Sequence, residues 1–253
     1  MPEHGFYRDR IYGAYASARE LPLAPSSLAG LNPHLPYLRR LIQQHFPKDR
    51  QSVILDVGCG HGALLYALRE AGYVHARGVN GSAEQAQAAK RLGIAGVERE
   101  KAMPALASIV DASLDVVVAF DVIEHFTKDE LVSLIDEVRR VLHPAGYWIL
   151  HVSDGESPFF ARIRYGDFTH EQAFTRISLD QLLRAIGLRS VACFEDRPVP
   201  HGVLSVIREE LWSLIRWGLL GYIAVETGIW DRRAVFSQNL LAVASLKGGY
   251  RWS

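Results

Sequence analysis

The stretch that most constrains the fold is residues 53–62, with the sequence VILDVGCGHG. An apolar run carries Asp56 near its end, and Gly58, Gly60 and Gly62 follow at alternate positions before a set of leucines at helical spacing. This order predicts a buried parallel strand, a tight turn and a helix. Glycine permits positive φ and close approach of a ligand, and a helix N-terminus offers unpaired N–H groups. The stretch therefore predicts a site for a nucleoside-bearing cofactor, and a glycine-rich turn without a ligand is the alternative.

Composition excludes several classes of protein. The chain has 253 residues, of which 49% are hydrophobic, so it can form one α/β domain with additions. Its 28 basic and 28 acidic residues balance, which argues against a nucleic-acid partner. Cys59 and Cys193 are too few for a disulfide framework, and no zinc-like spacing occurs, so we expect no metal. Met1–Arg10 is polar and no long apolar run exists, which predicts a cytoplasmic protein.

The remaining pattern alternates between strands and helices. Strands are expected at 74–79, 96–99, 114–120, 147–152, 190–194 and 238–246, and helices at 35–46, 62–71, 83–92, 104–110, 128–142, 179–186 and 203–224. Ser82 and Ser178 are the expected N-caps of the helices that follow them.

Four features in this order resemble those of the class I S-adenosylmethionine-dependent methyltransferases. They are the G-x-G-x-G turn after Asp56, the strand ending at Asn80, the strand that runs into Asp121-Val-Ile-Glu-His125, and the Leu-His-Pro-Ala-Gly turn at 142–146. The resemblance implies an α/β fold with a doubly wound, mostly parallel seven-stranded sheet and an antiparallel C-terminal pair of strands. It also implies S-adenosylmethionine as the cofactor.

By this resemblance, the cofactor should contact the glycine turn and the ends of the second and fourth strands. The expected residues are Asp56, Gly58, Cys59, Gly60, Asn80, Gly81, Phe120 and Asp121. The family commonly has an acidic residue where this chain has Asn80, so one ribose contact should lack charge assistance. Glu100 corresponds to a residue beside the adenine, although 98–101 is also typical of a solvated charge run.

The loop after the fifth strand should hold the acceptor. Residues 164–175, RYGDFTHEQAFT, resemble a segment of a bacterial methyltransferase group associated with polysaccharide and glycolipid assembly. An alcohol acceptor needs a base, and a histidine suits that role. His170 is the first candidate, with Asp167 or Glu171 orienting it, and His125 and His201 are competitors. His170 could instead serve only to brace its loop, and the same two roles are open for Glu124 and His125.

We therefore expect an N-terminal arm or lid at 1–34 and a methyltransferase domain at 35–253. Within the domain, 153–176 is the expected acceptor loop and 198–236 a helical insertion that covers the substrate. The 203–224 helix would be a core or dimer helix, or a surface that contacts membranes. The predicted reaction is O-methylation of a sugar or glycolipid precursor. N- or C-methylation of another small metabolite, or an inactive cofactor-binding partner protein, are the alternatives.

Overall fold

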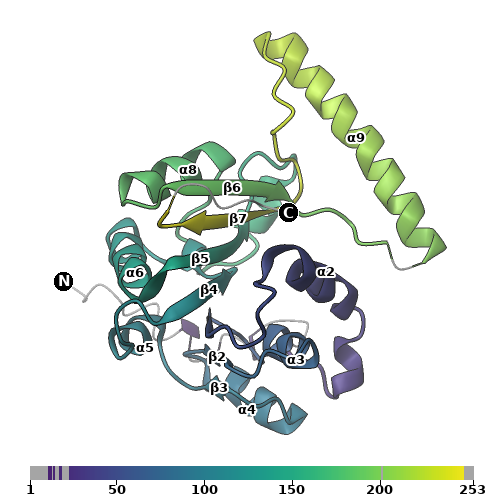
Figure 1. Cartoon of the computed structure of the whole chain (residues 1–253). Coiled ribbons are helices and arrows are strands. Elements are labelled where there is room, and N and C mark those ends of the chain that lie inside the picture. Colours follow the sequence, from purple (N-terminus) through teal and green to yellow (C-terminus); the bar gives the residue numbers. More distant parts are fainter. Residues whose placement is uncertain (1–10, 13, 15–16, 19–22, 201, 248–253) are drawn as a thin grey trace.

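The computed structural model describes residues 11–12, 14, 17–18, 23–200 and 202–247. Its centre is a seven-stranded sheet of order β3-β2-β1-β4-β5-β7-β6 (Figure 1). The strands are β1 (Ile54–Val57), β2 (Ala76–Val79), β3 (Val97–Glu98), β4 (Leu114–Phe120), β5 (Leu142–Ser153), β6 (Ser190–Glu195) and β7 (Asn239–Ser245). Neighbouring strands are parallel except where β7 pairs with β5 and β6. This confirms the predicted mostly parallel sheet with its antiparallel C-terminal pair.

Helices cover both faces of the sheet because its buried strands present apolar side chains on alternate sides. In β4, Val116 and Val118 pack against α2 (Leu35–His45), α3 (Ala63–Glu70) and α4 (Ala83–Leu92). Val117 and Ala119 pack against α5 (Ala102–Ala107), α6 (Lys128–Val141) and α8 (Arg176–Ala185). The result is the three-layer arrangement that the alternating pattern predicts.

Several boundaries differ from the prediction. The N-cap of α8 is Thr175, and Ser178 closes a capping box with it from the third helical position. The sequence suggested Ser178 because both residues can accept a backbone hydrogen bond. β5 begins at Leu142 instead of Tyr147, since Leu142 pairs with Leu114 across an irregularity in the ladder. The predicted helix at 104–110 is α5, which begins at Ala102 and ends at Ala107.

The insertion before β7 contains the longest helix of the described chain, α9 (Val203–Thr227), which projects away from the sheet (Figure 1). Only Ser205 and Leu220 of this helix are buried. The suggestion that it is a core helix is therefore wrong, because its apolar side chains have no layer of this chain to pack against. Even so, no helix in the described ranges is both long enough and apolar enough to cross a bilayer. The remaining helical segments are η1 (Leu28–Leu31), η2 (Ile123–His125) and α7 (Phe160–Arg164).

Candidate active site

The glycine turn lies at the carboxyl end of β1, where ligands bind in open α/β sheets. Gly58 and Gly60 have φ of 74° and 56°, which favours glycine at both positions. A Cβ on Gly58 would lie 2.3 Å from Val122 Cγ2, so the turn approaches the segment after β4 closely. A Cβ on Gly60 would meet no atom within 4 Å. The surface above Gly60 is therefore open, as a cofactor cradle requires.

Asp56 lies in β1 beneath this turn and is 3% exposed. No side chain or backbone group in the described part of the chain donates a hydrogen bond to its carboxylate. Burial raises the pKa of Asp56 to about 8. Burying a carboxylate costs free energy unless a cation or a hydrogen-bond donor lies beside it. Asp56 and the open surface at Gly60 thus fit a ligand that carries an amino group, as S-adenosylmethionine does.

Cys59 lies in the same turn. Burial raises the pKa of its thiol, so Cys59 is not an activated nucleophile.

Asn80 and Gly81 follow β2 at the same edge of the sheet. The Asn80 side-chain oxygen accepts a hydrogen bond from the Ser82 amide at 2.7 Å, which begins the turn into α4. Ser82 caps that helix, as predicted, by accepting from the Gln85 amide. Asn80 therefore keeps its side-chain NH₂ as a donor for the nucleoside side of a ligand, whereas an acidic residue there would accept from ribose hydroxyls.

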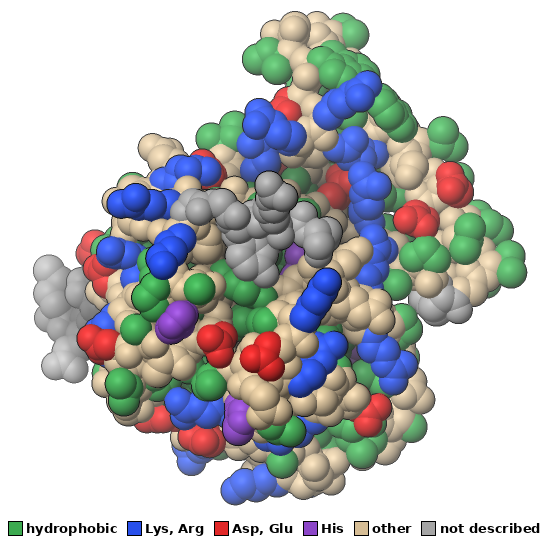
Figure 2. All heavy atoms as spheres, in the orientation of Figure 1, with side chains coloured by type: hydrophobic (Ala, Val, Ile, Leu, Met, Phe, Trp, Pro, Cys, Tyr) green, Lys and Arg blue, Asp and Glu red, His purple; other side chains and the backbone are tan. Residues whose placement is uncertain are grey.

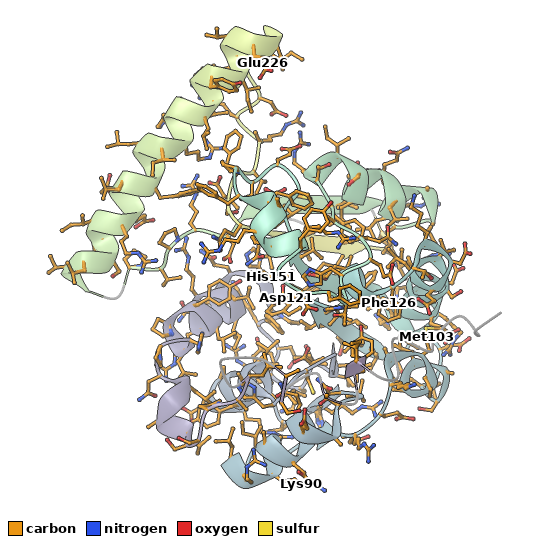
Figure 3. The ribbon with its side chains drawn as sticks, turned by 180° about the vertical axis from the view of Figure 1, so that it is seen from behind. Lys90, Met103, Asp121, Phe126, His151 and Glu226 are labelled. Carbon is orange, nitrogen blue, oxygen red and sulfur yellow. The ribbon has the colours of Figure 1, made fainter. Side chains whose placement is uncertain are left out.

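A second set of side chains, the His151 cluster, consists of Asp121, His151 and Asp196. Asp121 follows β4 directly, and Figure 3 shows it next to His151. His151 Nδ1 is 2.8 Å from Asp121 Oδ1, and His151 Nε2 is 3.3 Å from Asp196 Oδ2. Phe120 is paired with His151 across β4 and β5, and their ring centroids are 5.3 Å apart. Asp121 has φ of 53°, an uncommon value for a non-glycine residue, and its amide donates to the His151 carbonyl.

The His151 cluster holds a charged imidazole. Burial alone would lower the pKa of His151, but the Asp121 and Asp196 carboxylates outweigh it and raise the pKa to about 10. Loss of water around Asp121 would raise the pKa of that carboxyl, yet the opposed His151 charge holds it below its usual value. His151 therefore donates from both ring nitrogens at neutral pH and is a poor base.

The acceptor loop is fastened to the turn after β4 through Glu124. The Glu124 carbonyl accepts hydrogen bonds from the amides of Glu171 at 2.8 Å and Gln172 at 3.0 Å. Its side chain is fully buried, and burial together with the Asp121 charge raises the pKa of the carboxyl to about 8. Of the two roles left open for Glu124 by the sequence, these contacts are those of a brace. They bring His170 to the turn that carries His125.

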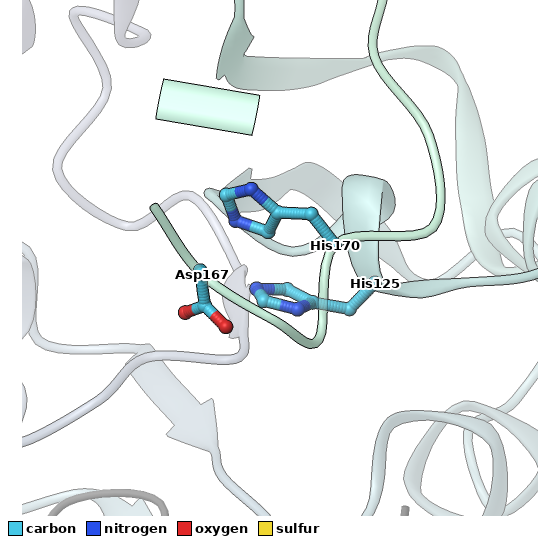
Figure 4. Close-up of side chains that lie close together, drawn as sticks. All are labelled: His125, Asp167 and His170. Atoms are coloured by element: carbon cyan, nitrogen blue, oxygen red, sulfur yellow. The ribbon is translucent and has the colours of Figure 1, made fainter. Parts of the chain in front are cut away.

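A third set, the His125 cluster, forms where the loop meets this turn and consists of His125, Asp167, Thr169 and His170. Figure 4 shows His125, Asp167 and His170 of this cluster. The ring centroids of His125 and His170 are 4.8 Å apart. Thr169 Oγ1 donates to Asp167 Oδ1 at 2.6 Å and lies 2.9 Å from His125 Nδ1. Nδ1 is also 3.3 Å from the Thr169 carbonyl, which can only accept. His125 Nδ1 must therefore carry the proton, which leaves the lone pair on Nε2.

Burial lowers the pKa of His125, and the nearby His170 lowers it further. His125 is thus a neutral imidazole at physiological pH, in a fixed tautomer, with Asp167 orienting it through the Thr169 hydroxyl. His170 Nδ1 is buried and has no hydrogen-bond partner among the described residues. These properties suit proton transfer better than those of His151 do.

The same side chains also form a candidate donor set for a cation. One ligand atom each from His125, Asp167 and His170 lies within 4.8 Å of the others. Two imidazoles and a carboxylate suit several divalent transition metals. The sequence contained no cluster of such residues, because the loop brings them together across 45 positions.

The structure thus joins His170 and Asp167, which the sequence suggested as a base and its orienting group, with His125, which it suggested as a competing base. Glu171 contributes its amide to the Glu124 brace, and its carbonyl accepts from Arg164. His201 lies outside the described residues. His151 and Asp196 were missed, although a histidine within the apolar run of β5 is a signal that could have revealed the first of them.

Comparisons with known proteins agree with the fold. Residues 55–150 match the family model described as a methyltransferase domain. The search of curated proteins gave no match. A solved S-adenosylmethionine-dependent methyltransferase from Archaeoglobus fulgidus is similar in structure, with a TM-score of 0.63 and 19% identity over 93% of this chain and 98% of that one.

Two other solved structures share the fold. A putative methyltransferase from Haloferax volcanii, in complex with the Trm112 activator, has a TM-score of 0.63 and 16% identity, covering 93% of this chain and 97% of that one. The 1,6-didemethyltoxoflavin-N1-methyltransferase of Burkholderia thailandensis, with S-adenosylhomocysteine bound, has a TM-score of 0.54 and 16% identity, covering 94% and 86%. The match over residues 55–150 and the shared fold support an enzyme that transfers methyl groups from S-adenosylmethionine.

Proposed function

We propose that this enzyme O-methylates a hydroxyl group of a sugar or glycolipid precursor. The observation that carries the proposal is the neutral, oriented imidazole of His125 beside the acceptor loop. A hydroxyl is a poor nucleophile near pH 7, so a base that takes its proton during attack should help about 10²–10⁴-fold. A neutral amine acceptor would need less help from a base.

In this proposal the cofactor lies over the glycine turn, on the open surface at Gly60. Its amino group lies at Asp56 and its nucleoside near Asn80, Gly81 and Asp121. S-adenosylmethionine supplies an electrophilic methyl group on a sulfonium. The protein positions the acceptor hydroxyl and removes its proton at His125 Nε2. His170 lies next to His125 and is the alternative base. The sequence favoured His170, whereas the Asp167–Thr169–His125 contacts support His125.

A sugar acceptor is supported by the aromatic side chains on the same loop. Phe159, Tyr165 and Phe168 are 69%, 76% and 81% exposed. Exposed aromatic faces can stack on the apolar faces of sugar rings, and such exposure on a functional loop is otherwise unfavourable. N- or C-methylation of another small metabolite is the rival function, and the toxoflavin-type N1-methyltransferase shows that the shared fold accommodates such chemistry.

Two experiments test the proposal. Isothermal titration should show S-adenosylhomocysteine binding, weakened about tenfold by Asp56→Asn and unchanged by Asp129→Asn, the same change on the exposed surface of α6. Absence of binding would refute the assigned cofactor site. Transfer of labelled methyl groups to a panel of glycans, amines and carbon acids should then give O-methyl products. Exclusive labelling of amines or carbon would refute the acceptor assignment.

The exposed face of α9 supports a contact with a lipid surface, where glycolipid precursors lie. Leu204, Leu214 and Val225 are 78%, 69% and 89% exposed, and Trp217 and Tyr222 lie on the same helix. Apolar and aromatic side chains interspersed with arginine are typical of interfacial helices. Flotation with phospholipid vesicles should recover the protein. A stable homodimer in sedimentation velocity, with no flotation, would show that α9 pairs with a second copy instead. The cytoplasmic location stays a prediction for cell fractionation.

A further inference from the structure

A basic cavity of about 440 Å³ lies between α2, the end of β6 and the insertion that carries α9. Its arginines come from all three parts of the chain: Arg40, Arg197, Arg216, Arg232 and Arg233. Figure 2 shows Lys and Arg side chains along the boundary between α9 and the rest of the domain. The volume falls within the range of small-molecule sites. The position, at the carboxyl end of β6, is on the ligand-binding edge of the sheet.

The two carboxylates that line this cavity are already paired. Glu195 Oε2 lies 2.9 Å from Arg197 Nε and 3.0 Å from Arg216 Nε. Asp196 faces the charged His151. Glu195 is thus engaged by two arginines and Asp196 by His151, and the five arginines of the cavity outnumber its two carboxylates.

Arg40 and Arg232 have no carboxylate partner in the described part of the chain. Arg40 NH1 reaches only the Pro198 carbonyl, at 3.5 Å. The Arg232 guanidinium lies 5.8 Å from the ring centroid of Trp217. Arg216 donates to the carbonyls of Arg232 and Ala234, which fixes the segment that carries Arg232 at the rim of the cavity. Two guanidinium groups held in a concave site with an excess of positive charge favour an anion.

We propose that this cavity binds a phosphate or diphosphate group of the methyl acceptor. Guanidinium groups match phosphate oxygens in paired hydrogen bonds, and several of them around one cavity suit the multiple charge of a diphosphate. Asp196 belongs both to the cavity wall and to the His151 cluster, so the cavity adjoins the turn that bears Asp121. This inference rests on the proposed function, which it extends to a phosphorylated acceptor.

Isothermal titration of the full chain with inorganic pyrophosphate at low ionic strength tests the site. Arg40→Gln and Arg232→Gln should each weaken binding about tenfold, since each removes a charge-assisted hydrogen bond. Arg232→Lys should retain part of the affinity. Arg91→Gln, the same change on the exposed surface of α4 near the opposite edge of the sheet, should bind as the wild type does. Thermal melts of each variant check the fold. Arg40 is half-buried and Arg232 is exposed, so neither substitution should lower the melting temperature.

Two further arms distinguish the sources of the phosphate. If the protein binds glucose 1-phosphate and Arg232→Gln weakens that binding, the result supports a soluble acceptor. Flotation that increases when phosphatidic acid is added to phosphatidylcholine vesicles supports a lipid-linked acceptor, provided that Arg232→Gln removes the increase. Failure of wild-type protein to bind pyrophosphate, or equal binding by the Arg40→Gln/Arg232→Gln double variant, overturns the inference. S-adenosylhomocysteine titrated into the same samples separates this failure from failure of the cofactor site.

Discussion

The two histidine clusters on either side of the turn after β4 contain the same side chain in opposite states. His151 lies between two carboxylates and has its pKa raised to about 10. His125 donates to a threonine hydroxyl, and burial beside His170 lowers its pKa. Proximity to the site therefore does not decide which histidine can act as a base. The hydrogen-bond partners of each imidazole decide whether it can act as a base. Carboxylates hold the proton on His151, whereas the Thr169 contacts leave a lone pair on His125.

The largest effect is expected from removing the proposed base. His125→Gln should lower kcat about 10²–10³-fold, while the affinity for S-adenosylhomocysteine stays unchanged. Steady-state kinetics with the acceptor identified by the transfer assay measure this loss. Thr169→Val should lower kcat less, through loss of the orienting hydroxyl, and Thr169→Ser should restore it. His170→Gln is the matched control on the neighbouring ring. A greater loss of kcat in His170→Gln than in His125→Gln would reverse the assignment.

A smaller effect, on stability, is expected at His151. Its raised pKa contributes stability that is fully present below the unfolded pKa of 6.5 and is lost as pH rises through about 10. His151→Gln should therefore lower the free energy of unfolding by about 3 kcal/mol at pH 6.5, and the difference from wild type should shrink towards pH 10. Urea unfolding at a series of pH values measures it. His75→Gln, on the exposed surface, is the control. If the free energies of unfolding of wild type and His151→Gln differ by the same amount at every pH, His151 is uncharged.

The smallest effect is expected from metal removal. If the His125 cluster transfers protons, exhaustive treatment with EDTA should leave turnover unchanged, because no step would need a cation at its ligand atoms. Elemental analysis of the purified protein accompanies the kinetics. Loss of turnover that returns on addition of Zn²⁺ or Mn²⁺, and that fails to return in Asp167→Asn, would make this cluster a metal site.

Much of the fold followed from local sequence. The glycine spacing after Asp56, the alternation in β4 and the amphipathic pattern of α6 each depend on residues close together in the chain, and they predicted the strands and helices. The resemblance to class I methyltransferases then implied the seven-stranded doubly wound sheet. The candidate residues His125, Asp167 and His170 were also found from sequence, because their segments resemble those of known methyltransferases.

The sequence could not predict which side chains contact each histidine, because these contacts join residues that lie far apart in the chain. His151 meets Asp196 only because β5 and β6 both pair with β7, and Thr169 meets His125 only because the Glu124 carbonyl fastens the acceptor loop. The arginines of the basic cavity likewise come from three separate segments. Local pattern thus determined the elements and the cofactor turn, because backbone propensity and hydrophobic period act over a few residues. The tertiary structure decided the charge state of each histidine and the basic cavity, because electrostatic interactions depend on distance in space.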